Sequence, residues 1–116
     1  TGLDPEGSAE TSYSSSRDLI ILAQKLLETP LIWQILSTPQ INLYGAELIN
    51  SNILLGKIPE IIGGKTGYTE KALGCFLLVL EAPNDNRYLI NIVLGADDRF
   101  GEMEKLIDWV NQAYKW

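Results

Sequence analysis

The sequence predicts an α+β fold, in which helices from both ends of the chain pack on an antiparallel β-sheet. Two observations support this prediction. Residues 73–82 and 87–94 are apolar, β-rich runs separated by turn-forming residues, which is the pattern of a β-hairpin. Near both ends of the chain, apolar residues instead recur at steps of three and four, the spacing of an amphipathic helix.

The N-terminal part of the chain is expected to form a loop followed by two helices. Residues 1–13 are rich in Gly, Ser and Glu and have no apolar period. Ser15 and Asp18 then form a capping-box pattern, which marks a helix start. Thr29 ends this helix, because the residue before a proline avoids the helical region, and caps a second helix with Pro30 in its first turn. The first helix has an apolar stripe of Leu19, Leu22, Ala23 and Leu26.

The middle of the chain is expected to form strands. Ile41 and Leu43 alternate with other residues, which predicts a short strand with one buried face. Residues 50–52, with the sequence Asn-Ser-Asn, predict a turn or a capped start. Residues 61–68 are typical of a strand despite their glycines. Several glycines in one strand suggest that another backbone or a ligand approaches closely.

A C-terminal helix on the sheet is expected to begin at Asp97 or Asp98, either of which can cap it. Its apolar residues repeat at alternating steps of three and four, with neighbours that broaden the buried face. The repeat comprises Phe100, Met103, Ile107, Val110 and Tyr114, and the broadening residues are Leu106, Trp109 and Ala113.

Composition limits the class of protein. The 116 residues, of which 46% are hydrophobic, are expected to form a single domain, residues 1–116. A net charge of -6 would repel phosphate backbones, so we expect no nucleic-acid partner. The longest uninterrupted apolar run, residues 75–80, is too short to cross a bilayer. The single cysteine, Cys75, has apolar neighbours and is expected to be a buried thiol.

Residues 63–67, with the sequence Gly-Gly-Lys-Thr-Gly, are the segment most informative about function. One interpretation is the end of a phosphate-binding loop of the form G-x-x-x-x-G-K-[ST]. The first glycine of that pattern would fall at Pro59, which lacks a backbone donor. The segment that follows is also typical of a strand, whereas a phosphate loop leads into a helix. We therefore disfavour nucleotide binding.

The preferred interpretation is a strand at the edge of a cleft, which binds a peptide ending in a carboxylate. The Thr66 hydroxyl can donate to a carboxylate oxygen, and the Lys65 ammonium supplies positive potential. Gly67 lets a ligand come close to the main chain. The alternative is a tight surface turn with a solvated lysine, because short motifs have many chance matches.

The chain as a whole resembles the C-terminal half of the catalytic domain of serine-type D-alanyl-D-alanine carboxypeptidases. These are the low-molecular-mass penicillin-binding proteins, peptidase family S11. The matching segments occur in the family's order and cover nearly the whole chain. They are residues 1–3 (Thr-Gly-Leu), 13–19, 50–55 (Asn-Ser-Asn-Ile-Leu-Leu), 63–69 (Gly-Gly-Lys-Thr-Gly-Tyr-Thr) and 93–96.

This resemblance implies part of a β-lactamase-like αβα sandwich and a two-step acyl transfer. A serine would attack the peptidoglycan stem peptide that ends in D-Ala-D-Ala, and β-lactams would react with the same complete site. Lys65, Thr66 and Gly67 would bind the terminal carboxylate, and Lys65 would also assist proton transfer. The backbone amide of Tyr68 would be one oxyanion-hole donor. The resemblance implies no cofactor, no metal and a location outside the cytoplasm.

The nucleophile of such an enzyme is not in this sequence. No Ser-x-x-Lys occurs, and residues 14–17 have the right spacing but end in Arg17, which cannot lose its proton to act as a base. We therefore expect an inactive C-terminal portion whose chemistry needs a preceding segment. The alternative is a noncatalytic peptidoglycan-binding or structural domain.

Two further expectations concern the surroundings of the site. An uncovered sheet edge is prone to pairing with another copy, so self-association is possible. Arg99 follows the last strand and can add positive potential to the cleft. The preferred interpretation is that it is a solvated partner of Asp97 or Asp98.

Overall fold

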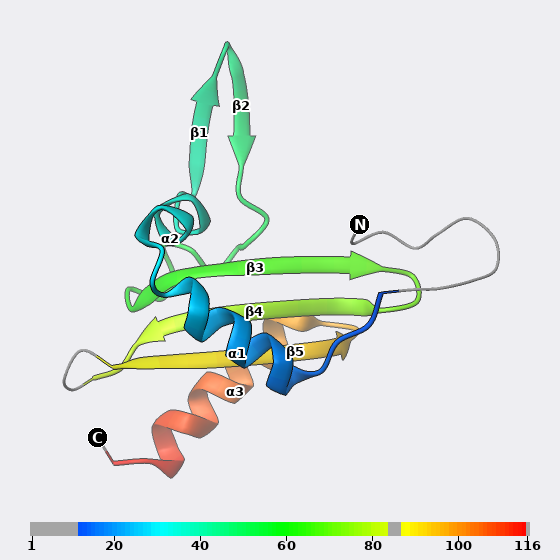
Figure 1. Cartoon of the computed structure of the whole chain (residues 1–116), viewed down its shortest axis with the longest axis vertical. Helices are drawn as coiled ribbons and strands as arrows, with labels where there is room; N and C mark the ends of the chain where they lie inside the picture. The colour runs from blue at the N-terminus through cyan, green and yellow to red at the C-terminus, as the bar shows by residue number, and fades with distance from the viewer. Residues whose placement is uncertain (1–11, 84–86, 116) are drawn as a thin grey trace.

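The computed structural model describes residues 12–83 and 87–115 and confirms the predicted α+β fold. Residues 1–11 of the loop predicted at 1–13, and residues 84–86 of the turn predicted at 83–86, lie outside the described residues. Figure 1 shows the arrangement of the elements. They are α1 (Ser16–Leu26), α2 (Pro30–Leu36), β1 (Gln40–Leu43), β2 (Ala46–Ile49), β3 (Ile61–Thr69), β4 (Leu73–Glu81), β5 (Tyr88–Ala96) and α3 (Arg99–Ala113).

The main sheet has three antiparallel strands in the order β3-β4-β5. The predicted pairing of β4 with β5 is confirmed, with Phe76 opposite Val93. The strand predicted at residues 61–68 is β3, which places Lys65 opposite Leu77 on β4. Within the described residues β4 is therefore the central strand, and β3 and β5 are the edges.

Helices cover both faces of this sheet, as expected for an αβα sandwich. Neighbouring residues on a strand point to opposite faces, so Leu77 and Leu78 mark the two sides of β4. Leu77 lines a hollow together with residues of α1 and α2. Leu78 packs in the core with Met103 of α3. The predicted packing of helices from both ends of the chain is thus confirmed (Figure 1).

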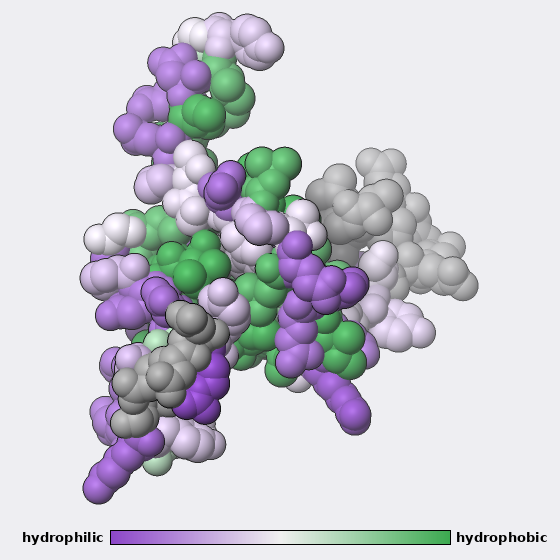
Figure 2. Space-filling model, turned by 60° about the vertical axis from the view of Figure 1, so that its left-hand side comes forward, coloured by the Kyte–Doolittle hydropathy of each residue, from purple (hydrophilic) through white to green (hydrophobic). Residues whose placement is uncertain are grey.

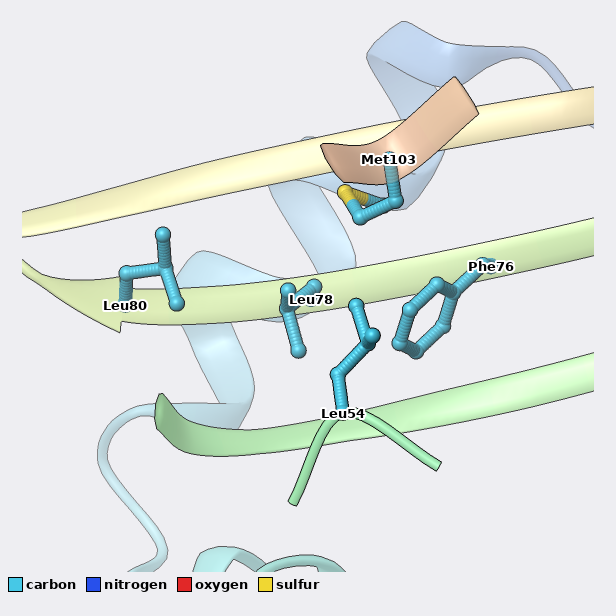
Figure 3. Packing of buried hydrophobic residues seen from close by; sticks show 5 residues of the cluster. All are labelled: Leu54, Phe76, Leu78, Leu80 and Met103. Atoms are coloured by element: carbon cyan, nitrogen blue, oxygen red, sulfur yellow. The ribbon is translucent and has the colours of Figure 1, made fainter. Parts of the chain in front are cut away.

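The hydrophobic core lies between the sheet and α3 (Figure 3). Three alternate residues of β4 point into it and meet one methionine of α3 and one leucine from the loop before β3. The cluster comprises Leu54, Phe76, Leu78, Leu80 and Met103. The ring of Phe100 extends the cluster, because it meets the Phe76 ring edge-on with the centroids 5.3 Å apart.

Local hydrogen bonds explain where the helices begin. The Ser15 hydroxyl accepts from the Asp18 amide at 3.2 Å, and the Asp18 carboxylate accepts from the Ser15 amide at 3.2 Å, so the predicted capping box is confirmed. Asp98 caps α3 by accepting from the Gly101 amide at 3.0 Å. The indole of Trp33 donates to the Leu26 carbonyl at 2.8 Å and ties α2 to the end of α1.

The buried face of α3 is shorter than the sequence pattern predicted. Trp109 is 57% exposed, and Ala113 and Tyr114 are exposed as well. The apolar residues of α3 that pack on the core extend only to Ile107. The prediction was wrong for the last turns because periodicity gives the apolar side of a helix but not the length of the surface that it meets.

The strand predicted at Ile41 and Leu43 exists, but its expected buried face does not. Both side chains are exposed, at 46% and 43%, and β1 pairs with β2, which the sequence reading missed. Tyr44 and Gly45 join the two strands with positive φ angles of 52° and 84°. This is the backbone sign pattern of a two-residue hairpin turn. The β1–β2 hairpin stands away from the main sheet (Figure 1).

No single helix among the described residues is long and apolar enough to cross a bilayer. Helices α1 and α2 meet that requirement only when they are taken together, and the chain bends by 113° between them.

Candidate substrate-binding site

The Lys-Thr-Gly segment lies in an extended edge strand. Residues 65–67 are in the second half of β3, which among the described strands pairs only with β4. The opposite edge of β3 therefore has backbone donors and acceptors that an extended peptide can pair with. The alternative of a tight surface turn is wrong, because β3 continues to Thr69.

Lys65 is exposed and lies on the sheet face that α1 and α2 cover. Its ammonium donates to the Thr66 carbonyl. It lines a hollow of about 420 Å³ whose other walls are almost entirely apolar. These walls come from α1 (Leu19, Leu22, Leu26), α2 (Ile32, Trp33, Leu36) and the sheet (Thr66, Gly67, Cys75, Phe76, Leu77, Leu94). Figure 2 shows hydrophobic residues, in green, on the surface of the molecule.

Thr66 points to the opposite face, because it is opposite Phe76 in the sheet register. It is only 7% exposed. Its hydroxyl lies 2.5 Å from the hydroxyl of Ser51, in the loop that leads from the hairpin toward β3. The structure thus brings together two hydroxyls that are 15 residues apart in the sequence.

The glycines of β3 have different surroundings. A Cβ at Gly63 would lie 3.0 Å from the Trp33 ring, and one at Gly64 would lie 2.9 Å from the Leu77 carbonyl oxygen. A Cβ at Gly67 would meet only Cys75, at 3.9 Å, among the described residues. Gly64 is therefore required by packing, and Gly63 is tightly packed against α2. At Gly67 the fold itself leaves room, which suits the close approach of a ligand.

Tyr68 lies at the end of the segment, opposite Gly74 on β4, and its side chain is 61% exposed. The oxyanion-hole role of its backbone amide stays a prediction.

Arg99 is positioned behind this part of β3. One terminal nitrogen of its guanidinium donates to the Gly67 carbonyl at 3.5 Å, and the group lies 4.8 Å from the centre of the Phe100 ring. Its Nε is buried without a hydrogen-bond partner among the described residues. The expected solvated pairing with Asp97 or Asp98 is not the arrangement found, because the guanidinium is directed to Gly67 and Phe100 and Asp98 instead caps α3. The alternative, that Arg99 adds positive potential beside the Lys-Thr-Gly segment, fits this position.

The loop of residues 50–52 holds Ser51 in place and was predicted only as a turn or capped start. The side-chain amide of Asn50 donates to the Leu36 carbonyl at 3.3 Å and to the Thr38 carbonyl at 3.0 Å. Its side-chain oxygen accepts from the Asn52 amide at 2.9 Å. The loop is thereby fixed to the end of α2. The match of Asn-Ser-Asn to a family segment was the only sequence signal for this role.

The prediction that Cys75 is a buried thiol was wrong, because its side chain is only partly buried. It lies where the pairing of β4 with β5 shifts register, between Gly74 and Phe76. Its sulfur lies 3.7 Å from the Ala72 carbonyl oxygen, and its side chain lines the apolar hollow beside Lys65. A register shift of this kind is not visible in a continuous apolar run.

Other parts of the described chain have fewer features of a binding or catalytic site. A second hollow, of about 520 Å³, lies at the start of β3 and the end of β4 and is bordered by Lys57, Glu60, Glu81, Glu104 and Asp108, among others. In residues 12–83 and 87–115, no three His, Cys, Asp or Glu residues are grouped so that they could hold a metal ion. A hydrogen bond and the charge of Glu102 raise the pKa of Lys105, which is exposed on α3 and outside the site.

The fold with its Lys-Thr-Gly edge strand is similar to the fold of penicillin-binding proteins. Penicillin-binding protein D2 from Listeria monocytogenes, solved in its cefotaxime-bound form, superposes with a TM-score of 0.80 and 35% identity. That match covers 92% of this chain and 44% of the Listeria protein. The PBP3 structure from Streptococcus pneumoniae has a TM-score of 0.77 and 25% identity, over 93% of this chain and 36% of that protein.

The chain belongs to the D-alanyl-D-alanine carboxypeptidase family, peptidase family S11, whose family model matches residues 1–98. The carboxypeptidase DacF of Bacillus subtilis is 32% identical over 99% of this chain. The carboxypeptidase DacD of Escherichia coli is 33% identical over 97% of it. The chain spans 30% and 29% of the lengths of these two relatives. The resemblance seen in the sequence is thereby confirmed.

Proposed function

We propose that this chain supplies the substrate-binding strand of a serine-type D-alanyl-D-alanine carboxypeptidase. The complete enzyme removes the terminal D-alanine from peptidoglycan stem peptides through an acyl-enzyme. Family membership supports the reaction class. The observation on which the proposal rests most is that Lys65, Thr66 and Gly67 lie in an edge strand and not in a turn or a helix.

In this proposal the stem peptide pairs with the free edge of β3 as an added strand. Its terminal carboxylate accepts from the Thr66 hydroxyl and lies in the positive potential of Lys65 and Arg99. Gly67 permits the approach, because a Cβ there has no close neighbour within the described part of the chain. Two cations near one anionic group favour a ligand that ends in a carboxylate over an amidated one.

The chemistry requires a serine from polypeptide outside this sequence. The serine oxygen bonds to the carbonyl carbon of the penultimate D-alanine, the peptide C–N bond breaks, and D-alanine leaves with the proton lost by the serine. Water then hydrolyses the ester. The Tyr68 amide donates to the developing oxyanion, an interaction worth about 3 kcal/mol of transition-state stabilisation. Lys65 assists the proton transfers.

The apolar hollow beside Lys65 fits a division of the site between two parts of one protein. Leucines and other apolar residues from two helices and the sheet line it, and so much apolar surface is unfavourable in water. We propose that the polypeptide with the nucleophile covers this hollow and so reaches Lys65. The same proposal places the site outside the cytoplasm, where peptidoglycan is found.

A noncatalytic peptide-binding domain is the second candidate. Its basis is that the edge strand β3, which strand addition needs, lies wholly within this chain. Such a domain retains strand addition at β3 but forms no acyl-enzyme. An uncovered sheet edge would also allow two copies to pair.

Reaction with a fluorescent penicillin distinguishes the two candidates. We expect no covalent adduct on this chain alone, as judged by denaturing gel electrophoresis. A longer polypeptide that adds a Ser-x-x-Lys segment, encoded upstream or taken from the B. subtilis relative, should be labelled. Labelling should fall strongly when Lys65 is changed to alanine. An adduct on the isolated chain would contradict the divided site, and an unlabelled longer polypeptide would favour the binding domain.

A further inference from the structure

The close contact between Ser51 and Thr66 carries an inference about how the site binds a carboxylate. The two hydroxyl oxygens are 2.5 Å apart, and either can be the donor. Ser51 is exposed, whereas Thr66 is 7% exposed, so the Thr66 side chain is held by its neighbours and not by solvent. Their contact joins the loop of residues 50–52 to the middle of β3.

A count of protons shows that the direction of this hydrogen bond matters. Each hydroxyl has one proton to donate and two lone pairs to accept with. If Thr66 donates to Ser51, its only proton is engaged and it can offer a ligand nothing but lone pairs. If Ser51 donates to Thr66, the Thr66 proton is free to point at the ligand. An ionised carboxylate only accepts hydrogen bonds, so it can bind Thr66 only in the second arrangement.

We propose that Ser51 is a positioning residue: it donates to the Thr66 oxygen and so directs the Thr66 proton toward the carboxylate of the substrate. Hydrogen bonds arranged in such a chain polarise and strengthen one another. The backbone around Ser51 is fixed for this task, because Asn50 binds two carbonyls near the end of α2 and the Asn52 amide. Asn52 is buried, and its side-chain oxygen accepts from the Leu54 amide at 3.1 Å.

This inference rests on the proposed function, and the test keeps the two apart. The probe is N-acetyl-D-alanyl-D-alanine, titrated into the chain while the amide resonances of residues 65–68 are followed by NMR. The matched ligand without a charge is the corresponding D-alaninamide. The variants are Ser51→Ala and Ser51→Thr, each alone and in a Thr66→Val background. Ser16→Ala is the control, because Ser16 is also exposed but lies in the first turn of α1.

We expect Ser51→Ala to weaken binding of the acid about fivefold, the effect of one oriented hydrogen bond, and Ser51→Thr to restore it. Binding of the D-alaninamide should not change. In the Thr66→Val background, Ser51→Ala should have no further effect. Scalar couplings should show one χ1 rotamer for Thr66 in the unmodified chain and averaging in Ser51→Ala.

Three results would overturn the inference. The first is that Ser51→Ala binds the acid as tightly as the unmodified chain. The second is that Ser51→Ala causes the same loss of affinity in the Thr66→Val background as it does alone. The third is that Thr66 keeps a single χ1 rotamer in Ser51→Ala. The second would mean that Ser51 touches the ligand itself. If the unmodified chain shows no shift at residues 65–68 with the acid, the proposed function fails, and the inference fails with it.

Discussion

The two halves of β3 use glycine in different ways. Gly63 and Gly64 in the first half are crowded by Trp33 of α2 and by the Leu77 carbonyl, and a larger side chain at Gly64 would collide with that carbonyl. Gly67 in the second half has no such neighbour within the described residues. The comparison teaches that one glycine-rich strand contains two kinds of glycine, the first required by packing and the second left open on the site side.

The residues around the two halves fit the same division. The first half lies against α2 and the core, which hold the sheet together. The second half is bordered by a hydroxyl on Ser51 and a guanidinium on Arg99. Substitutions in the first half should therefore change stability, and substitutions in the second should change ligand binding.

The largest effect is expected for Gly64→Ala. The added Cβ would lie 2.9 Å from the Leu77 carbonyl oxygen and 3.0 Å from side-chain atoms of Leu78 and Phe76. Backbone and core would have to shift, which should lower the free energy of unfolding by about 3 kcal/mol. Urea denaturation followed by circular dichroism measures this change. A loss below about 0.5 kcal/mol, the usual limit for a surface substitution, would show that this half of β3 is not constrained by packing.

Gly67→Ala is the matched variant, and it should weaken ligand binding while leaving stability nearly unchanged. Its Cβ has room within the described fold, so the free energy of unfolding should change by less than about 0.5 kcal/mol. Affinity for N-acetyl-D-alanyl-D-alanine should fall about tenfold, which is about 1.4 kcal/mol, because the methyl group occupies the path of the ligand. The NMR titration described above measures the affinity. Unchanged affinity would remove Gly67 from the site.

Arg99→Met should have a smaller effect, because the guanidinium acts on the ligand through its charge. The substitution keeps most of the side-chain length over Gly74 but removes the positive charge behind Gly67. Affinity for the acid should fall about threefold at low salt, and the loss should shrink as salt screens the charge. The D-alaninamide is the control ligand. An equal loss for both ligands would mean that Arg99 shapes the strand and does not attract the carboxylate.

The smallest effect on global stability is expected for Gly45→Ala in the β1–β2 hairpin. The φ angle of 84° disfavours a side chain by about 1 kcal/mol, although the space around the position is open. Exchange of the hairpin amides should speed up about fivefold, which that penalty implies. The free energy of global unfolding should hardly change, because the hairpin stands away from the sheet (Figure 1). A global loss as large as that of Gly64→Ala would contradict this separation.

Much of the fold was predictable because its signals are local. Ser15 and Asp18 predict the start of α1 through a capping box, and Pro30 predicts the first turn of α2. Two apolar runs predict β4 and β5. Chemistry between residues close in the chain determines each of these features. The Lys-Thr-Gly segment was predictable as part of a strand for the same reason.

The parts that were missed depend on distant residues. The contact of Ser51 with Thr66 spans 15 residues, and that of Arg99 with Gly67 spans 32, so neither is visible as a pattern. The exposure of Trp109 depends on where α3 leaves the sheet. The pairing of β2 is the exception, because it is local and was missed for another reason: its turn uses Tyr44, a residue type that rarely has positive φ. The partial exposure of Cys75 depends on a register shift.

The central claim is that the second half of β3 receives a peptide that ends in a carboxylate. The most direct measurement is the set of intermolecular NOEs between this chain and the methyl groups of N-acetyl-D-alanyl-D-alanine. We predict NOEs from the terminal D-alanine methyl to the amides of Thr66, Gly67 or Tyr68. NOEs confined to other surfaces, such as the hollow bordered by Glu60 and Glu104, would contradict the account.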